Sequence, residues 1–485
     1  MKKKNNNSLT VMMKSNYTNY LAYRVALENG DTTAVNEVNS FLAEIESQKH
    51  LNAFLETFDD TALALAAQVD EKIKNGTAGK LAGMVIGLKD NLCYKDHSVS
   101  VSSKILSNFK SLFSATAVAR LLAEDAIIIG RLNCDEFAMG SSNEKSAFGP
   151  VLNPYDNTRV SGGSSGGSAV AVAANLCHAS LGTDTGGSVR QPASFTGTVG
   201  LKPTYGRISR WGLIAYGSSL DQIGPFTKTV QDSALLLEVM AGGDEFDTTA
   251  SPLPVADYSQ ANSEGKKKIA VLRDALESEG LSLAVKKRFT EVIEKLKADG
   301  HQVDVVDFSL LNQMVPTYYV ISNAEASSNL SRFDGIHYGY RSPAATDIES
   351  TYVKSRTEGF GEEVKRRIMM GTFVLSTGYY DAYFAKAQKV RRLIQDKTKA
   401  IFENYDLVLT PTTPHGAFKL GHNSTDPIAM YLEDIFTVHA NLAGNPAISL
   451  PMGTNEEGMP FGIQLMAPFF GEKEMFGFAD RLMKL

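Results

Sequence analysis

The feature that most constrains the fold is the alternation of short apolar runs with helical segments. Met84–Leu88 and Ala126–Gly130 are compact apolar runs beside glycines, and a helical pattern over 114–124 lies between them. The same order of apolar run, amphipathic helix and apolar run returns between residues 268 and 306. Short apolar runs are typical of buried strands. Strands that alternate with helices favour an α/β fold around a parallel or mixed sheet.

Further elements follow from the same patterns. We expect helices over Tyr20–Leu27 and Asp60–Lys74, the first ending at an Asn-Gly pair that is typical of a helix C-terminus. Ser114 is the expected N-cap of the helix over 114–124. Two apolar runs near the end, Asp406–Thr410 and Ala447–Leu450, predict additional strands.

The domain organisation is predicted to be simple. No internal repeat or low-complexity linker interrupts the chain, and strand and helix patterns resume after the polar segment 242–268, which is the best boundary candidate. We therefore expect one large domain after a flexible leader. The expected parts are the leader at 1–14 and the domain at 15–485, made of a helical part (15–80), a catalytic core (81–245) and a part that completes the sheet and substrate pocket (246–485).

Composition excludes several classes of protein. The chain has 485 residues, 43% hydrophobic and 21% charged, with a formal net charge of −6, which is typical of a globular protein. The acidic pI near 5.8 argues against a dedicated nucleic-acid binder. Three widely spaced cysteines predict free buried thiols, and eight scattered histidines make a metal site unexpected. Without an export signal or a spanning segment, we expect a soluble cytoplasmic protein.

One stretch departs from ordinary composition. Residues 161–190 contain seven glycines and six serines, in two clusters around the apolar run 169–176. A flexible linker would not carry that apolar run. A phosphate-binding P-loop requires a lysine after its glycines, and the GxGxxG pattern of dinucleotide folds is also absent. The remaining interpretation is acyl transfer by a serine.

Serine catalysis needs an oxyanion site and a base. We expect the backbone N–H groups of Thr185, Gly186 and Gly187 to converge on a developing oxyanion, which such donors stabilise by about 2.7–4 kcal/mol each. The base is usually histidine, but His178 is interpreted as a packed core residue. A buried lysine with a lowered pKa is the other kind of base, and Lys89 ends an apolar strand.

Three sequence blocks together resemble the amidase-signature hydrolases. They are GLKDN at 87–91, SGGSSGGS at 161–168 and DTGGSVRQPA at 184–193, in that order. The resemblance implies a single amidase-signature domain of α/β class, with a central mixed sheet covered by helices on both faces. It also implies a Ser–cis-Ser–Lys triad, in which Ser188 is the nucleophile and Ser164, after a cis peptide bond, relays the proton. Lys89 is then the base and must be neutral to accept it.

More stretches are similar to one branch of that family, which supplies ammonia for tRNA-dependent amidation. The resemblance implies that Arg367 pairs with the α-carboxylate of glutamine, Asp434 with its α-ammonium, and that Tyr318 makes a further contact. The stretches are Asn133–Gly140, Gly200–Arg207, Ser218–Pro225, Ala324–Asn329, Gly361–Gly371 and Asn441–Pro446.

The same resemblance implies a division of labour. This chain would hydrolyse the glutamine side-chain amide, and partner subunits B and C would complete a heterotrimer that converts Glu-tRNA(Gln) to Gln-tRNA(Gln). The chain has no ATP-binding motif and no basic stripe for tRNA, so we expect no cofactor in it and expect ATP and Mg to be used by the partner.

Two other functions remain open at this point. A stand-alone amidase for small aryl or aliphatic amides would share the triad but would not have both Arg367 and Asp434 in its pocket. A catalytically silent structural subunit is the second alternative, although such a subunit has no need of Lys89, Ser164 and Ser188. One serine among Ser100–Ser103 is also expected to approach the pocket.

Overall fold

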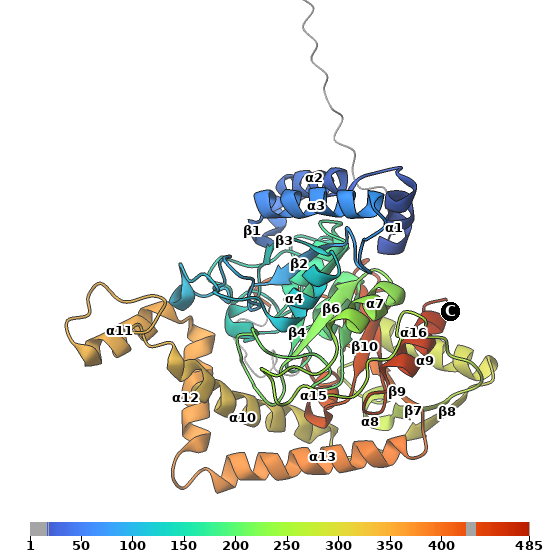
Figure 1. The fold of residues 1–485 in the computed structure, drawn as a ribbon. Helices are drawn as coiled ribbons and strands as arrows, with labels where there is room; N and C mark the ends of the chain where they lie inside the picture. The colour runs from blue at the N-terminus through green and yellow to red at the C-terminus, as the bar shows by residue number, and fades with distance from the viewer. Residues whose placement is uncertain (1–16, 18, 423–432, 485) are drawn as a thin grey trace, which may run out of the picture.

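The computed structural model describes residues 17, 19–422 and 433–484 (Figure 1). Within these ranges an eleven-stranded mixed sheet has the order β1-β3-β2-β4-β6-β5-β10-β11-β9-β7-β8. The pairs of β2 with β3 and β4, and of β7 with β8 and β9, are parallel, and the other pairs are antiparallel. The strands are β1 (Phe54–Thr57), β2 (Val85–Lys89), β3 (Ile127–Leu132), β4 (Ala179–Asp184), β5 (Val199–Lys202), β6 (Gln222–Thr227), β7 (Lys268–Leu272), β8 (Gln302–Val306), β9 (Leu407–Pro411), β10 (Ala447–Thr454) and β11 (Pro460–Met466).

The six strands that we predicted (β2, β3, β7, β8, β9 and β10) are confirmed, with ends that differ by up to four residues. Five strands escaped prediction, namely β1, β4, β5, β6 and β11. All of these except β1 contain glycine or proline, residues that are depleted in strands. Pro225 lies inside β6 opposite Leu181, but the pairing of β6 with β5 covers only its last two residues, so Pro225 has no partner residue on that side.

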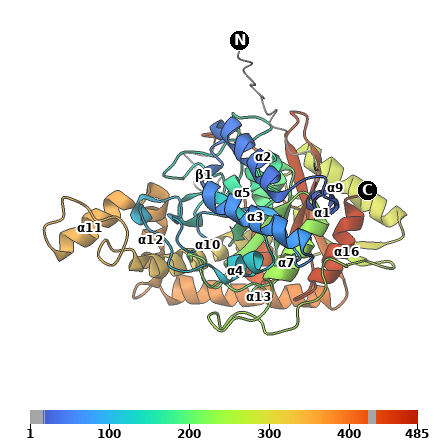
Figure 2. The same cartoon turned by 45° about the horizontal axis from the view of Figure 1, so that its top comes forward.

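Helices cover both faces of the sheet, as predicted (Figures 1 and 2). Helices α5 and α6 pack against each other, while α7 packs on β5 and β6 and contacts both α4 and α16. The helices are α1 (Tyr20–Asn29), α2 (Ala34–Ser47), α3 (Asp59–Lys74), α4 (Thr116–Ala123), α5 (Gly166–Ala173), α6 (Arg190–Thr196), α7 (Val230–Met240), α8 (Arg273–Leu276), α9 (Leu283–Ala298), α10 (Leu311–Asn329), α11 (Ile348–Gly359), α12 (Glu362–Leu375), α13 (Lys386–Phe402), α15 (Val438–Ala443) and α16 (Glu472–Leu482). Shorter turns are η1 (Lys49–Leu51), η2 (Lys104–Leu106), η3 (Glu136–Ala138), η4 (Leu330–Arg332) and the π-helical η5 (Asp381–Ala385).

A second helical group lies along one side of the molecule. Helix α10 packs on α12, α13 and α15, and α11 projects away from the sheet (Figure 1). Helices α11 and α12 expose large apolar side chains such as Val353 and Met369, whereas α10 buries a long run that includes Tyr318 and Tyr319. This group therefore brings residues from the last third of the chain to the sheet strands of the first half.

The predicted helix ends are partly confirmed. Helix α1 ends at Asn29, and Gly30 adopts a left-handed φ of 77°, which glycine adopts without strain. The predicted capping role of Ser114 is wrong, because α4 begins at Thr116 after Ala115 and has no side-chain cap. The Ser114 hydroxyl instead accepts a hydrogen bond from the Lys95 N–H at 3.2 Å, where the two loops lie side by side.

One sheet takes strands from both the first and the second half of the chain, which confirms a single large domain. The candidate boundary at 242–268 is tied to the core, since Arg207 donates hydrogen bonds to the carbonyls of Leu253 and Pro254 at 3.2 and 2.8 Å. The predicted leader, 1–14, lies outside the described residues, and the three-part division of the domain stays a prediction. All three cysteines are buried free thiols, as predicted. No described helix is long and apolar enough to cross a membrane.

Candidate active site

Lys89 lies at the end of β2 and is completely buried between β3 and β4. Its Nζ lies 2.7 Å from Ser164 Oγ, 2.9 Å from Ser165 Oγ and 3.0 Å from Thr183 Oγ1. Burial lowers the pKa of Lys89 to about 8, because desolvation disfavours the ammonium. A neutral amine has two N–H donors and one lone pair, so three hydroxyl partners match it when Ser164 donates to the lone pair.

Ser164 sits in the turn before α5, and the Gly163–Ser164 peptide bond is cis. Two neighbours hold this turn. Gln191 Oε1 accepts from the Gly163 N–H at 3.0 Å, and the Ser164 carbonyl accepts from the Asp135 N–H at 3.0 Å. A Cβ on Gly163 would overlap the Asp135 carboxylate, so only glycine fits beside it. The Gly-rich sequence thus allows Ser164 to approach Lys89.

Ser188 lies on the adjacent turn, between β4 and α6. Its carbonyl accepts a hydrogen bond from the Ser165 N–H at 3.3 Å, which places the two serine turns against each other. Asp184 holds the start of α6, since its carboxylate accepts from the Val189 N–H at 3.2 Å and from Arg190 Nη2 at 2.9 Å. Lys89, Ser164 and the Ser188 turn are therefore brought together in space.

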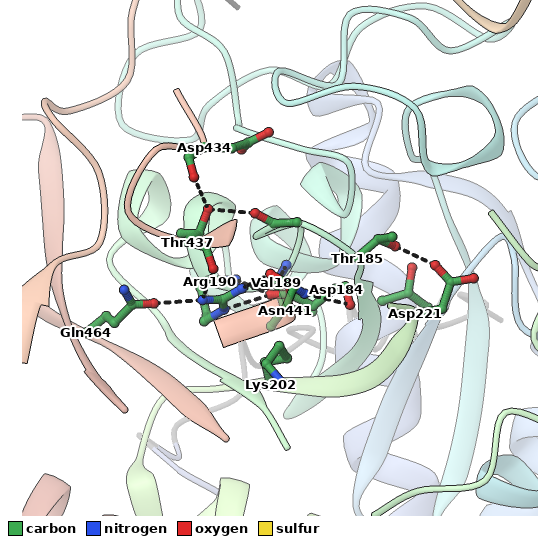
Figure 3. A network of polar contacts seen from close by, with 12 residues as sticks. Asp184, Thr185, Val189, Arg190, Lys202, Asp221, Asp434, Thr437, Asn441 and Gln464 are labelled. Carbon is green, nitrogen blue, oxygen red and sulfur yellow. Dashed lines mark hydrogen bonds and ion pairs between the residues drawn. The ribbon is translucent and has the colours of Figure 1, made fainter. Parts of the chain in front are cut away.

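Arg190 fastens this turn to the last third of the chain (Figure 3). It is fully buried and donates to the Thr437 carbonyl and to Gln464 Oε1, both at 2.7 Å, and to Asn441 Oδ1 at 2.6 Å. Burial raises the pKa of Asp184, but the Arg190 guanidinium outweighs that effect and holds the pKa at about 2. Asp184 therefore stays a carboxylate at neutral pH, and its bonds to Val189 and Arg190 fix the turn that carries Ser188.

The predicted oxyanion donors lie on the same turn. In the part of the chain that the structure describes, the N–H groups of Thr185, Gly186 and Gly187 have no protein acceptor. The Thr185 hydroxyl donates to Asp221 Oδ1 at 2.6 Å, and the Gly186 carbonyl accepts from Thr437 Oγ1 at 2.7 Å. The turn is thus held by its side chains and carbonyls while its N–H groups remain available.

Tyr318, on α10, packs directly against that turn. A Cβ on Gly186 would lie 2.5 Å from Tyr318 Cζ and 2.7 Å from its hydroxyl oxygen, so the ring abuts the glycine. The tyrosine is buried, and this burial raises its pKa well above 10, which keeps the phenol neutral. The predicted substrate contact therefore lies next to the predicted oxyanion site.

Arg367 and Asp434 are both buried and share a neighbour, Tyr319. The Arg367 guanidinium lies 5.2 Å from the centre of the Tyr319 ring, and the Tyr319 hydroxyl donates to Asp434 Oδ2 at 3.3 Å. Burial raises the pKa of Asp434 to about 7. The two predicted partners of an amino acid's charged groups are thus brought into one polar cluster.

Both charges already have protein partners. Arg367 donates from Nε to Glu363 at 2.8 Å and from Nη1 to the Tyr216 hydroxyl at 2.8 Å. Asp434 accepts a hydrogen bond from the Ser141 hydroxyl at 2.9 Å. A ligand with opposite charges would add to these contacts or exchange with them.

Other residues behave as packing or support. His178 is buried before β4, accepts from the Val85 N–H at 3.1 Å and contacts Glu37, which confirms the core interpretation. Ser100 and Ser102 bind Asp90, the residue after Lys89, so they support the end of β2. The structure gives no group of three or more His, Cys, Asp or Glu side chains suited to a metal among the residues it describes.

Sequence reasoning missed several supporting residues, among them Ser165, Thr183, Asp184, Arg190 and Thr437. A signal existed for two of them, because Asp184 and Arg190 are opposite charges that flank the glycines of an otherwise uncharged block. Thr437 carried no local signal, since its partner Gly186 is 251 residues away in the chain.

Comparisons with known proteins find similarity over nearly the whole chain. A family model described as Amidase matches residues 36–476. The chain is 49% identical over 470 residues to the A subunit of glutamyl-tRNA(Gln) amidotransferase from Chlorobaculum tepidum, covering 96% of this chain and 98% of that one. The crystal structure of the corresponding Thermotoga maritima protein is 40% identical with a TM-score of 0.76, covering 93% of this chain and 91% of that one. The native peptide amidase of Stenotrophomonas maltophilia is 27% identical with a TM-score of 0.81, covering 97% of each chain.

Proposed function

The chain belongs to the amidase family, and on that premise we propose that it is the glutamine-hydrolysing subunit of a glutamyl-tRNA(Gln) amidotransferase. The contact that carries the proposal is the 2.7 Å approach of buried Lys89 to Ser164, beside the turn of Ser188. The similarity to proteins of that name over nearly the whole chain supports the choice of glutamine among amide substrates.

In the proposed mechanism Ser188 Oγ attacks the side-chain amide carbon of glutamine. Its proton passes through the Ser164 hydroxyl to the lone pair of Lys89, and the carbonyl oxygen gains negative charge, which the N–H groups of the 185–187 turn stabilise. The tetrahedral species collapses when the leaving amine takes a proton back along the same path and departs as ammonia. Water then hydrolyses the γ-glutamyl ester by the reverse proton movement and releases glutamate.

The charged cluster supplies the selectivity. Arg367 presents a planar guanidinium that matches the α-carboxylate, and the Asp434 carboxylate pairs with the α-ammonium. Tyr318 abuts Gly186, so its ring lies beside the oxyanion turn. Substrates without an amino acid backbone would leave Arg367 and Asp434 without their ligand partners.

We further propose that the ammonia is passed to other subunits rather than released. Subunits B and C would form a cytoplasmic heterotrimer with this chain, and Glu-tRNA(Gln) would be bound by the complex. The partner would use ATP and Mg to activate the tRNA-bound glutamate, and this chain would need no cofactor. Its formal net charge of −6 does not favour this chain as the tRNA-binding subunit.

The test is ammonia release by the tagged chain, purified from its host with whatever co-purifies. We expect release from glutamine, little from a simple aryl amide, stimulation by ATP with charged tRNA, and loss in Ser188→Ala. Ser168→Ala is the matched control, because Ser168 lies in the same block on α5 and its hydroxyl donates to the Leu181 carbonyl at 3.0 Å. Full release by Ser188→Ala would contradict the mechanism, and preferential release from the aryl amide would support a stand-alone amidase instead.

A further inference from the structure

Thr437 stands immediately before α15 and is completely buried. A threonine in this N-cap position ordinarily bonds to the first N–H groups of its own helix. Its side chain makes no such capping bond here. Thr437 Oγ1 instead lies 2.7 Å from the Gly186 carbonyl and 3.1 Å from the Asp434 carbonyl, and it has one proton to donate. The shorter distance favours Gly186, so the hydroxyl is committed to the oxyanion turn.

That bond fixes the direction of one peptide group. Among the residues that the structure describes, Gly163–Ser164 is the one cis peptide bond, so the Gly186–Gly187 bond is trans. In a trans peptide the C=O and the following N–H point in opposite directions. Since the Gly186 carbonyl is directed at Thr437, the Gly187 N–H is directed away from α15. It has no protein acceptor in the described ranges.

The same peptide group would otherwise turn easily. Glycine lies on both sides of it, and glycine tolerates backbone angles that other residues avoid. Gly187 has a φ of 140°, and a Cβ there would overlap the Thr437 hydroxyl. Close packing and the hydrogen bond from Thr437 together hold a conformation that the glycines alone would not fix.

Thr437 also shares its turn with Asp434. The N–H groups of Thr437 and Val438 donate to the Asp434 carbonyl at 3.0 and 3.1 Å. Figure 3 shows Thr437 between Asp434 and the turn, with its carbonyl accepting from Arg190 at 2.7 Å. One short segment therefore connects the carboxylate of the charged cluster to the oxyanion turn.

We propose that Thr437 is a positioning residue for amide hydrolysis, whose hydroxyl holds the Gly186–Gly187 peptide with the Gly187 N–H available to the carbonyl oxygen of the bound amide. Asp434 lies on the same turn. One short segment therefore carries both the carboxylate proposed to bind the amino acid's ammonium and the hydroxyl that positions the N–H group proposed to polarise the side-chain amide. The inference rests on the proposed glutamine hydrolysis and adds to it a residue outside the triad.

The test compares Thr437→Val with Thr437→Ser in the purified complex, by steady-state ammonia release from glutamine. Valine keeps the shape of threonine but lacks the hydroxyl, so we expect kcat to fall by roughly 10- to 100-fold, somewhat less than the loss of a whole oxyanion donor. We expect KM to stay within about threefold, since the Asp434 side chain keeps its bonds to Ser141 and Tyr319. Serine should restore kcat to within about threefold of the wild type.

Thr398→Val is the matched control. Thr398 is a buried threonine whose hydroxyl contacts His439, two residues beyond Thr437, and it has no contact with the oxyanion turn. The same chemical change there should leave kcat within about twofold. A control that loses as much kcat as Thr437→Val would assign the effect to disturbed packing of α15 and overturn the inference.

A second measurement does not depend on turnover. In glutamate γ-semialdehyde an aldehyde replaces the side-chain amide of glutamine. We expect Ser188 Oγ to add to the aldehyde carbon, so that the aldehyde oxygen becomes an oxyanion like that of the tetrahedral species in amide hydrolysis. Its inhibition constant should rise in Thr437→Val in proportion to the loss of kcat/KM, while that of glutamate should not. An unchanged constant for the semialdehyde would overturn the inference.

The outcomes separate the two proposals. No glutamine hydrolysis by the wild type would overturn the proposed function, and this inference with it. Wild-type hydrolysis together with an unchanged kcat in Thr437→Val would overturn the inference alone. Equal losses of kcat in Thr437→Val and Thr437→Ser would also overturn the inference, and so would a rise in KM at constant kcat in Thr437→Val.

Discussion

The proposed reaction side of the site (Lys89, Ser164 and Ser188) differs in construction from its proposed recognition side (Tyr318, Arg367 and Asp434). The reaction side is built from a strand end and two adjoining turns in the first two hundred residues, and Lys89 already lies 2.7 Å from Ser164. The recognition side comes from two helices and the turn before α15, and its charges are occupied by protein partners such as Glu363 and Ser141. The groups proposed for the chemistry are therefore assembled in advance, whereas a ligand on the recognition side would add to existing contacts or exchange with them.

This difference predicts which kinetic constant, kcat or KM, a substitution on each side will change. Removing a group of the reaction side takes away stabilisation that exists only in the transition state, so kcat should fall. Removing a group of the recognition side weakens substrate and transition state alike, so KM should rise. The two sides meet at the 184–190 turn, where Thr437 bonds to Gly186.

The largest effect is expected for Lys89→Met, which keeps the length of the side chain but removes the base. Loss of a general base typically costs about 10²–10⁴-fold in rate, and KM for glutamine should change little. The rate of ammonia release at saturating glutamine measures this loss of kcat.

The control for that prediction is Lys202→Met. Lys202 is also fully buried, and burial lowers its pKa to about 7, but its Nζ donates to the Pro203 carbonyl at 2.7 Å and touches no serine. Its replacement should leave kcat within a few-fold wherever the complex is folded. A comparable loss in both variants would show that buried lysines matter here for folding, and would break the distinction between the two sides.

An intermediate effect is expected for Arg367→Lys. Lysine keeps the charge but loses the planar fork and the contact with the Tyr319 ring, so KM for glutamine should rise by roughly 10- to 100-fold with kcat nearly unchanged. Arg366→Lys is the control, because Arg366 is half-exposed and pairs with Glu363. If Arg367→Lys reduced kcat instead, Arg367 would belong to the reaction side.

Sequence reasoning reached the two sides to different extents. Lys89, Ser164 and Ser188 lie in short blocks whose composition marks them, and the strands that carry Lys89 were visible as apolar runs. The antiparallel strands β5, β6 and β11 were not visible, because Gly and Pro weaken the strand pattern and long-range pairing stabilises them instead. Contacts across hundreds of residues, such as Arg190 with Gln464, depend on the tertiary fold and leave no local periodicity.

The smallest effect, and the finest test of the comparison, is the pH dependence of the two constants. Lys89 acts as a base only when neutral, and burial sets its pKa at about 8, so kcat should rise with pH through that value and fall about tenfold from pH 9 to pH 7. Asp434 binds an ammonium only as a carboxylate, and burial sets its pKa at about 7, so KM should begin to rise only as pH falls below that value. Glutamine titrations at half-unit intervals from about pH 6 to 9.5 would resolve the pH dependence of both constants.

In Lys89→Met the residual kcat should lose its pH dependence near pH 8 while the rise of KM at low pH remains, because the two groups belong to different sides of the site. A single shared midpoint for kcat and KM would mean that one ionisation controls both, and the two sides would then have to be treated as one coupled unit.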